Sequence, residues 1–78
     1  MDWSDSRALR RVIGANARRL RVARGLTQEA LAELIDSDQP YVSEIEGGLI
    51  NLTADILQSL AVALGVTPRE LCDERRVS

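Results

Sequence analysis

The chain has 78 residues, of which 45% are hydrophobic and 28% charged, a length and composition that fit one folded domain and exclude a disordered segment. Its ten cations are all arginine. Residues 1–25 hold seven of them against two acids, residues 26–78 hold three against ten acids, and the net charge is −2. An isoelectric point near 5.0 disfavours non-specific binding to phosphates, so a nucleic acid would have to be recognised by a few well-placed side chains.

The sequence also excludes several classes of protein. No apolar run approaches the ~18 residues that span a membrane. There is no histidine and only one cysteine, Cys72, which excludes an internal disulfide, a cysteine-based zinc site and a histidine-based catalytic triad. We expect Cys72 to be a small buried residue. We therefore expect a cytoplasmic protein with no enzymatic activity, no cofactor and no small-molecule ligand.

The first predicted helix covers residues 7–24. Apolar residues at helical spacing form one stripe along it: Leu9, Ile13, Ala17 and Leu20. Ser4 or Ser6 is the candidate N-cap. Gly25 can adopt a positive φ and is a typical residue at the end of a helix.

The second predicted helix covers residues 28–35, with Thr27 as its N-cap and Glu29 in the first turn, where the helix dipole favours an acid. The expected inward residues are Ala30, Leu31, Leu34 and Ile35. A short turn, residues 36–38, follows.

The third predicted helix covers residues 39–46 and is capped by Asp38. Pro40 is tolerated there because the first-turn amides have no partner within the helix. Val42 and Ile45 point to one side, and the other side carries small and polar residues. The helix is therefore short and amphipathic.

Two further helices complete the chain. The fourth starts at the Thr53 cap and stops at Gly65, and its inward residues are Leu57, Leu60, Ala61 and Leu64. Residues 67–70 read Thr-Pro-Arg-Glu, a capping box with proline at the first helical position, which predicts a fifth helix through about Glu74. The last residues, 75–78, are expected to fray.

Two short helices joined by a tight turn are typical of a helix-turn-helix. The chain resembles the phage repressor/Cro (Xre-type) DNA-binding family over about residues 9–74. The resemblance is carried by three runs: Leu26–Ala32, Gln39–Gly48 and Leu60–Val66. It implies an all-α, five-helix, lambda-repressor-like domain over residues 1–78, with a core at about 7–74 and frayed ends at 1–6 and 75–78. It also implies a sequence-specific DNA-binding transcriptional regulator.

The resemblance implies which side chains contact DNA, because the third helix of this family reads base edges in the major groove. The groove-facing residues are Gln39, Pro40, Ser43 and Glu44. Contacts to the DNA backbone are expected from Gln28, Arg21, Tyr41, Arg18 and Asn51. The family often pairs an arginine late in the first helix with the glutamate that ends the third. Here these residues are Arg21 and Glu46, and the pair would orient Arg21 towards a phosphate.

Each of these roles has an alternative. Gln39, Glu44 and Arg18 can alternatively be solvated surface side chains. Arg21 and Glu46 can be independent surface charges, and Tyr41 can pack half-buried against the domain. Trp3 either covers the edge of its own domain or contacts a partner.

The sequence departs from the family pattern in the turn and in the loop after the third helix. Asp36 stands where glycine is usual, and Ser37 replaces a usually buried valine. Gly47 removes a side-chain phosphate donor. Three apolar residues occupy a loop that is usually charged: Leu49, Ile50 and Leu52. We therefore expect weak non-specific DNA affinity.

A homodimer is expected, since the domain is small and two reading helices ~34 Å apart would recognise a palindrome. The predicted dimer surface consists of Leu49, Ile50, Leu52, Ile56, Pro68 and Arg69. The three loop residues can alternatively belong to the core of the domain. The short chain favours a controller of a restriction–modification operon, and the alternative is an antitoxin or adaptor whose main partner is a protein.

Overall fold

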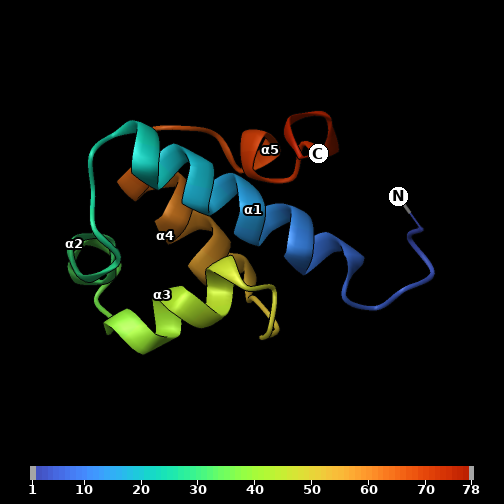
Figure 1. Cartoon of the computed structure of the whole chain (residues 1–78), viewed down its shortest axis with the longest axis horizontal. Coiled ribbons are helices and arrows are strands. Elements are labelled where there is room, and N and C mark those ends of the chain that lie inside the picture. Colours follow the sequence, from blue (N-terminus) through green and yellow to red (C-terminus); the bar gives the residue numbers. More distant parts are fainter. Residues whose placement is uncertain (1, 78) are drawn as a thin grey trace.

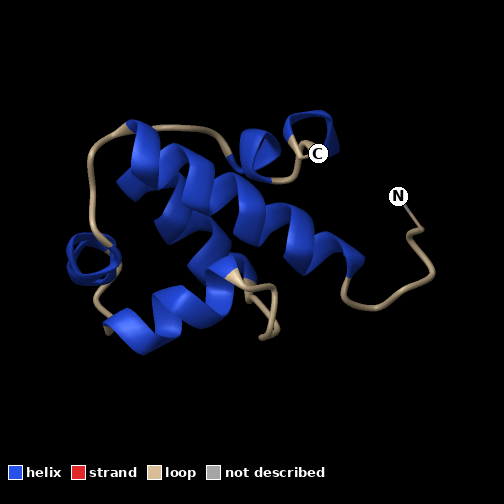
Figure 2. Ribbon diagram, viewed as in Figure 1, coloured by secondary structure: helices blue, strands red, loops and turns tan. Residues whose placement is uncertain are grey.

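The computed structural model describes residues 2–77, and within that range it is all-helical, as predicted. Figure 2 shows helices joined by loops, with no strand in the described part of the chain. The elements are α1 (Ala8–Ala23), α2 (Gln28–Leu34), α3 (Gln39–Glu46), α4 (Ala54–Leu64), α5 (Pro68–Leu71) and the 3₁₀ turn η1 (Glu74–Arg76). Between residues 2 and 77, no helix combines the length and the hydropathy needed to cross a membrane.

The long helix α1 runs through the middle of the molecule, and the other elements pack around it (Figure 1). In this view α3 and the loop that follows it lie on one side of α1, and α5 and η1 lie on the other. α2 packs against α3 at one end of the molecule. This arrangement leaves α3 at an edge of the domain.

The four predicted caps of α2 to α5 are confirmed, because each capping oxygen accepts a hydrogen bond from the backbone N–H three residues later. The capping residues are Thr27, Asp38, Thr53 and Thr67. The start of α1 differs from the prediction. Neither Ser4 nor Ser6 caps it; instead, Asp5 accepts a hydrogen bond from the N–H of Arg7, the residue at the N-cap position.

The predicted buried faces of two helices are confirmed except at one leucine in each. On α1, Ile13, Ala17 and Leu20 are buried as predicted, whereas Leu9 is exposed, and Ala8 and Val12 are buried as well. At α2, Leu31 and Ile35 are buried as predicted, whereas Leu34 is exposed, and Ala32 is buried as well. Hydrophobic spacing fixes that a helix has an apolar face, whereas the packing partner decides how far that face is covered.

A glycine lets α1 and α3 approach closely. A Cβ placed on Gly14 would meet the backbone carbonyl oxygen of Ile45 and would lie 2.8 Å from that of Glu46. The two helices therefore touch backbone to backbone at this point. This contact sets how far the end of α3 stands from α1.

The C-terminal part departs from the prediction because a buried side chain ends the helix early. α5 stops at Leu71 instead of about Glu74. The Nδ2 of Asn16, a fully buried residue, donates hydrogen bonds of 2.9 Å to the carbonyl oxygens of Leu71 and Asp73. These bonds hold the chain as it leaves α5. Cys72, next to them, is half-buried, and burial raises the pKa of its thiol.

The two ends are more ordered than expected. Residues 75 and 76, predicted to fray, belong to η1, which Asp73 caps by accepting a hydrogen bond from the N–H of Arg75. Residues 2–6 form turns in which Asp2 accepts hydrogen bonds from both the N–H and the hydroxyl of Ser4. Met1 and Ser78, which the same prediction included, lie outside the described residues.

Asp36 carries backbone strain, so its replacement by glycine is expected to raise the free energy of unfolding by about 0.5 kcal/mol. Its φ is 56°, and among the described residues it alone adopts a positive φ without being glycine. The measurement is urea unfolding followed by circular dichroism. Asp36→Ala is the control and should destabilise; a loss of stability in Asp36→Gly would mean that the aspartate side chain compensates the strain.

Candidate nucleic-acid interface

The outer face of α3 presents the residues that sequence analysis assigned to base contacts. Pro40, Ser43 and Glu44 are exposed, and Gln39 is half-buried at the start of the helix. Val42 and Ile45, on the opposite side, are buried in the core. Since α3 lies at the edge of the domain (Figure 1), no other element within residues 2–77 covers this face. The face is therefore free to contact a ligand.

A chain of hydrogen bonds links the start of α3 to α2 and to α1. The Nε2 of Gln39 donates to the Oε1 of Gln28 at 2.7 Å, and the Nε2 of Gln28 donates to the Oε1 of Glu46 at 3.1 Å. Arg21 holds the same carboxylate from the other side. Its Nε donates to Oε2 at 2.6 Å and its Nη2 to Oε1 at 3.1 Å. The network therefore connects three helices through four side chains.

The Arg21–Glu46 ion pair expected from the sequence is present, but it is buried. The exposed fractions of the two side chains are 11% and 4%. The hydrogen bond to Glu46 is the main cause that raises the pKa of Arg21. The Nη1 of Arg21 also donates to the carbonyl oxygen of Leu26 at 2.7 Å. The guanidinium is thus turned inwards, contrary to the expectation that the pair would point it towards a phosphate.

The structure does not gather the other residues assigned to the DNA backbone into one cluster. Gln28 belongs to the network, and Tyr41 is half-buried and packs against the core. Arg18 is exposed on α1. Asn51 is exposed in the loop after α3, where its Oδ1 accepts a hydrogen bond of 2.8 Å from Nη1 of Arg10. Tyr41 therefore belongs to α3 itself, and the other three positions belong to α1, α2 and the loop.

Sequence reasoning missed two residues that shape this region, Gly14 and Arg10. A glycine inside an otherwise regular helical pattern often marks a close packing contact, and that signal was available for Gly14. Arg10 holds the loop through Asn51, and its Nε is buried without a hydrogen-bond partner in the described structure. Nothing in the local sequence distinguishes Arg10 from the other arginines of α1.

The six residues assigned to a dimer surface fall into two groups. Leu49 is 70% exposed, whereas Ile50, Leu52 and Ile56 are half-buried against the core of their own domain. Pro68 and Arg69 are exposed at the start of α5, on the other side of α1 from the loop (Figure 1). The six residues therefore do not form one continuous patch, because α1 separates the loop from α5.

Comparison with protein families decides what this arrangement is. The family model described as Helix-turn-helix matches residues 18–71, which contain α2, the turn and α3. The chain belongs to the helix-turn-helix family. It is a DNA-binding transcriptional regulator and not an enzyme, in agreement with the resemblance to Xre-type repressors found in the sequence.

Individual relatives support the same assignment. The helix-turn-helix chain is 43% identical over 63 residues to an uncharacterized transcriptional regulator of this type from Sinorhizobium fredii, covering 81% of this chain and 82% of the relative. It is 35% identical to the control protein C.BamHI of Bacillus amyloliquefaciens, covering 83% and 82%.

Among solved structures, the restriction–modification controller protein C.AhdI of Aeromonas hydrophila superposes on this helix-turn-helix chain with a TM-score of 0.80 at 42% identity. The superposition covers 86% of this chain and 97% of the controller protein. The five-helix fold predicted from the sequence is therefore confirmed.

Proposed function

We propose that this regulator reads its operator with the outer face of α3, through Gln39, Pro40, Ser43 and Glu44. The observation that carries this proposal is the hydrogen bond from Gln39 to Gln28. It uses one N–H of the Gln39 amide and leaves the second N–H and the Oε1 available. One donor and one acceptor on the same amide are what a bidentate contact with adenine N6 and N7 requires.

Contacts to the DNA backbone are proposed for Tyr41 of α3 and for three residues of other segments, namely Gln28 of α2, Arg18 of α1 and Asn51 of the loop after α3. Arg21 serves this interface through Glu46 and Gln28, because its guanidinium is occupied within the domain. The exposed part of α3 carries no cation. Non-specific affinity for DNA should therefore be weak, and specificity depends on the few contacts to bases.

Replacing Gln39 with alanine is expected to weaken specific DNA binding by ~1–3 kcal/mol and to leave non-specific binding nearly unchanged. The measurement is a mobility shift at two salt concentrations on a DNA fragment selected from the genome by the protein. Gln58→Ala, an exposed glutamine of α4, is the matched control and should bind normally. Equal losses on specific and non-specific DNA would refute base reading by Gln39.

A homodimer is the proposed DNA-binding form, because a palindromic site read by two α3 helices is far more specific than one read by a single helix. The exposed Leu49, with Ile50, Leu52 and Ile56 around it, is the proposed centre of the interface. Pro68 and Arg69 are left out of it, since α1 separates them from the loop.

Leu49→Glu is expected to raise the dimer dissociation constant at least about tenfold, since a charge would replace an apolar contact. Sedimentation velocity at micromolar concentration measures it. The matched control is Val62→Glu on α4, which is equally exposed. A monomeric wild type, or a monomer produced by Val62→Glu and not by Leu49→Glu, would rule out this surface. Leu52 is unsuitable for the test because it also packs in its own core.

We propose that the chain controls a restriction–modification operon, because it is 42% identical to the restriction–modification controller protein C.AhdI and 35% identical to the control protein C.BamHI. Such a role places the protein in the cytoplasm, with access to the genome. The test is footprinting on the DNA upstream of its own gene. Protection of a palindrome next to genes of a nuclease and a methyltransferase supports this role, and protection elsewhere contradicts it.

A further inference from the structure

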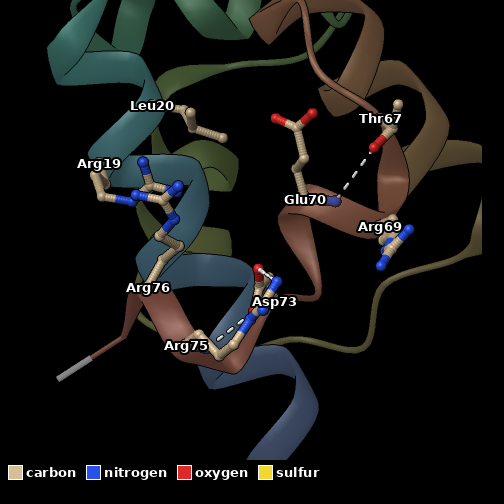
Figure 3. A pocket seen from close by; sticks show the side chains of 8 residues that line it. All are labelled: Arg19, Leu20, Thr67, Arg69, Glu70, Asp73, Arg75 and Arg76. Carbon is tan, nitrogen blue, oxygen red and sulfur yellow. Dashed lines mark hydrogen bonds and ion pairs between the residues drawn. The ribbon is translucent and has the colours of Figure 1, made fainter.

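A groove rich in arginine lies between α1, α5 and η1 (Figure 3). In Figure 1, α5 and η1 are on the side of α1 away from α3. Arg19 of α1 lines the groove together with Arg69 of α5 and with Arg75 and Arg76 of η1, so the groove joins α1 to the C-terminal elements of the chain. The groove has a volume of about 730 Å³ and is open along one side. Its other lining residues are Leu20, Thr67, Glu70 and Asp73.

The charges of this arginine groove are not balanced by the acids next to them. Asp73 is occupied by Arg75, whose Nε and Nη2 each donate to it at 3.0 Å (Figure 3), and these hydrogen bonds lower the pKa of Asp73 to about 2. Among residues 2–77, no carboxylate forms an ion pair with Arg19, Arg69 or Arg76. Glu70 remains as the other acid of the groove. Three arginines therefore face one carboxylate in a chain whose net charge is negative.

A second hollow continues the groove towards the N-terminus. It has a volume of about 330 Å³, shares Arg69, Asp73 and Arg75 with the arginine groove, and adds one further acid, Glu74. Trp3 lines it and is 51% exposed, so its ring offers an apolar surface to a ligand. Tryptophan and arginine are the residue types that most often dominate the energy of protein–protein contacts.

We propose that the arginine groove binds an acidic segment of a partner protein, with an apolar side chain of that segment packed on Trp3. Charge complementarity supports an acidic ligand, because clustered cations are stabilised by an anion that lies between them. The open shape supports a segment of a larger partner, since small-molecule sites enclose most of their ligand. α3 lies on the other side of α1, so the regulator can hold DNA and this partner at the same time.

The test uses a fluorescein-labelled, glutamate-rich peptide that contains one leucine, with a peptide that has glutamine at every glutamate position as its control. Binding to the full chain is measured by fluorescence anisotropy. We expect Arg76→Glu and Trp3→Ala each to weaken binding of the acidic peptide about tenfold. Both residues lie outside the proposed DNA interface, and unchanged operator binding shows that the variants are folded.

Two further measurements decide whether the site is specific. Arg24→Glu changes the net charge equally at an exposed position outside the groove and should leave peptide binding within about twofold of the wild type. The proposal is overturned if Arg24→Glu weakens binding as much as Arg76→Glu, or if the acidic peptide binds no better than the glutamine peptide. Inorganic tripolyphosphate is the competing ligand. If it binds more tightly than the peptide and Trp3→Ala has no effect, the groove is a phosphate site instead.

Discussion

Replacing Arg21 with alanine is expected to lower the free energy of unfolding by about 3–5 kcal/mol, the usual result of removing one partner from a buried ion pair. The carboxylate of Glu46 would remain 4% exposed and would lose both hydrogen bonds from the guanidinium. The free energy of unfolding of small domains is only about 5–15 kcal/mol, so this variant would lose much of its stability. Urea unfolding followed by circular dichroism measures the change.

Two controls distinguish the cost of leaving the Glu46 carboxylate buried without a partner from the cost of losing the packing contacts of Arg21. Arg21→Met combined with Glu46→Leu removes both charges and should cost much less than Arg21→Ala alone. Arg75→Ala breaks an ion pair whose arginine is exposed and should change stability little. If the double variant is as unstable as Arg21→Ala, the cause is lost packing rather than the isolated carboxylate.

The same variant distinguishes two ways in which Arg21 can serve DNA binding. A direct contact with phosphate would be lost equally on specific and non-specific DNA. An effect through Glu46 and Gln28 would mainly change the orientation of Gln39 and would mainly reduce specific binding. The inward-turned guanidinium leads us to expect the second pattern.

Replacing Gly14 with alanine is expected to destabilise the domain by about 3 kcal/mol, at the upper end of the cost of overpacking. The new Cβ would meet the backbone oxygens of Ile45 and Glu46, which cannot move away as a flexible side chain could. α3 would have to shift from α1, and the Arg21–Glu46 pair would be strained. Operator binding should therefore fall together with stability.

Gly47→Ala is the matched control for this prediction. At Gly47 a Cβ would have its nearest neighbours at 3.4 Å, in ordinary van der Waals contact, and φ is −81°. We expect nearly normal stability and DNA binding. Thermal unfolding and a mobility shift on both variants provide the comparison. Equal behaviour of the two variants would show that the contact between α1 and α3 is not a tight constraint.

The predictions about the fold that are confirmed depend on short stretches of sequence. The caps at Thr27, Asp38, Thr53 and Thr67 involve a hydroxyl or carboxylate and an amide three residues later, so the local sequence contains all the necessary partners. The Arg21–Glu46 pair was predicted for a different reason, since it came from resemblance to a family and not from spacing. Its burial was not predicted.

The predictions that failed concern relations between elements. Leu9 and Leu34 fit their helical stripes but are exposed, because the rest of the domain covers only part of each stripe. The end of α5 was missed because it is held by Asn16, more than fifty residues away in the sequence. The hydrogen bonds of Gln28 to Gln39 and Glu46 were not predicted, because they depend on the crossing of α2 and α3, whereas its contact with phosphate stays a proposal.

The sequence by itself determined the helical class, the starts of α2 to α5 and the helix-turn-helix pattern, because capping and hydrophobic periodicity act within one or two helical turns. Only the tertiary structure decided the close contact at Gly14, the inward direction of Arg21, and the separation of the loop around Leu49 from Arg69 by α1. These features depend on how helices cross. Crossing geometry is set by the packing of side chains from distant segments, which no short stretch of sequence contains.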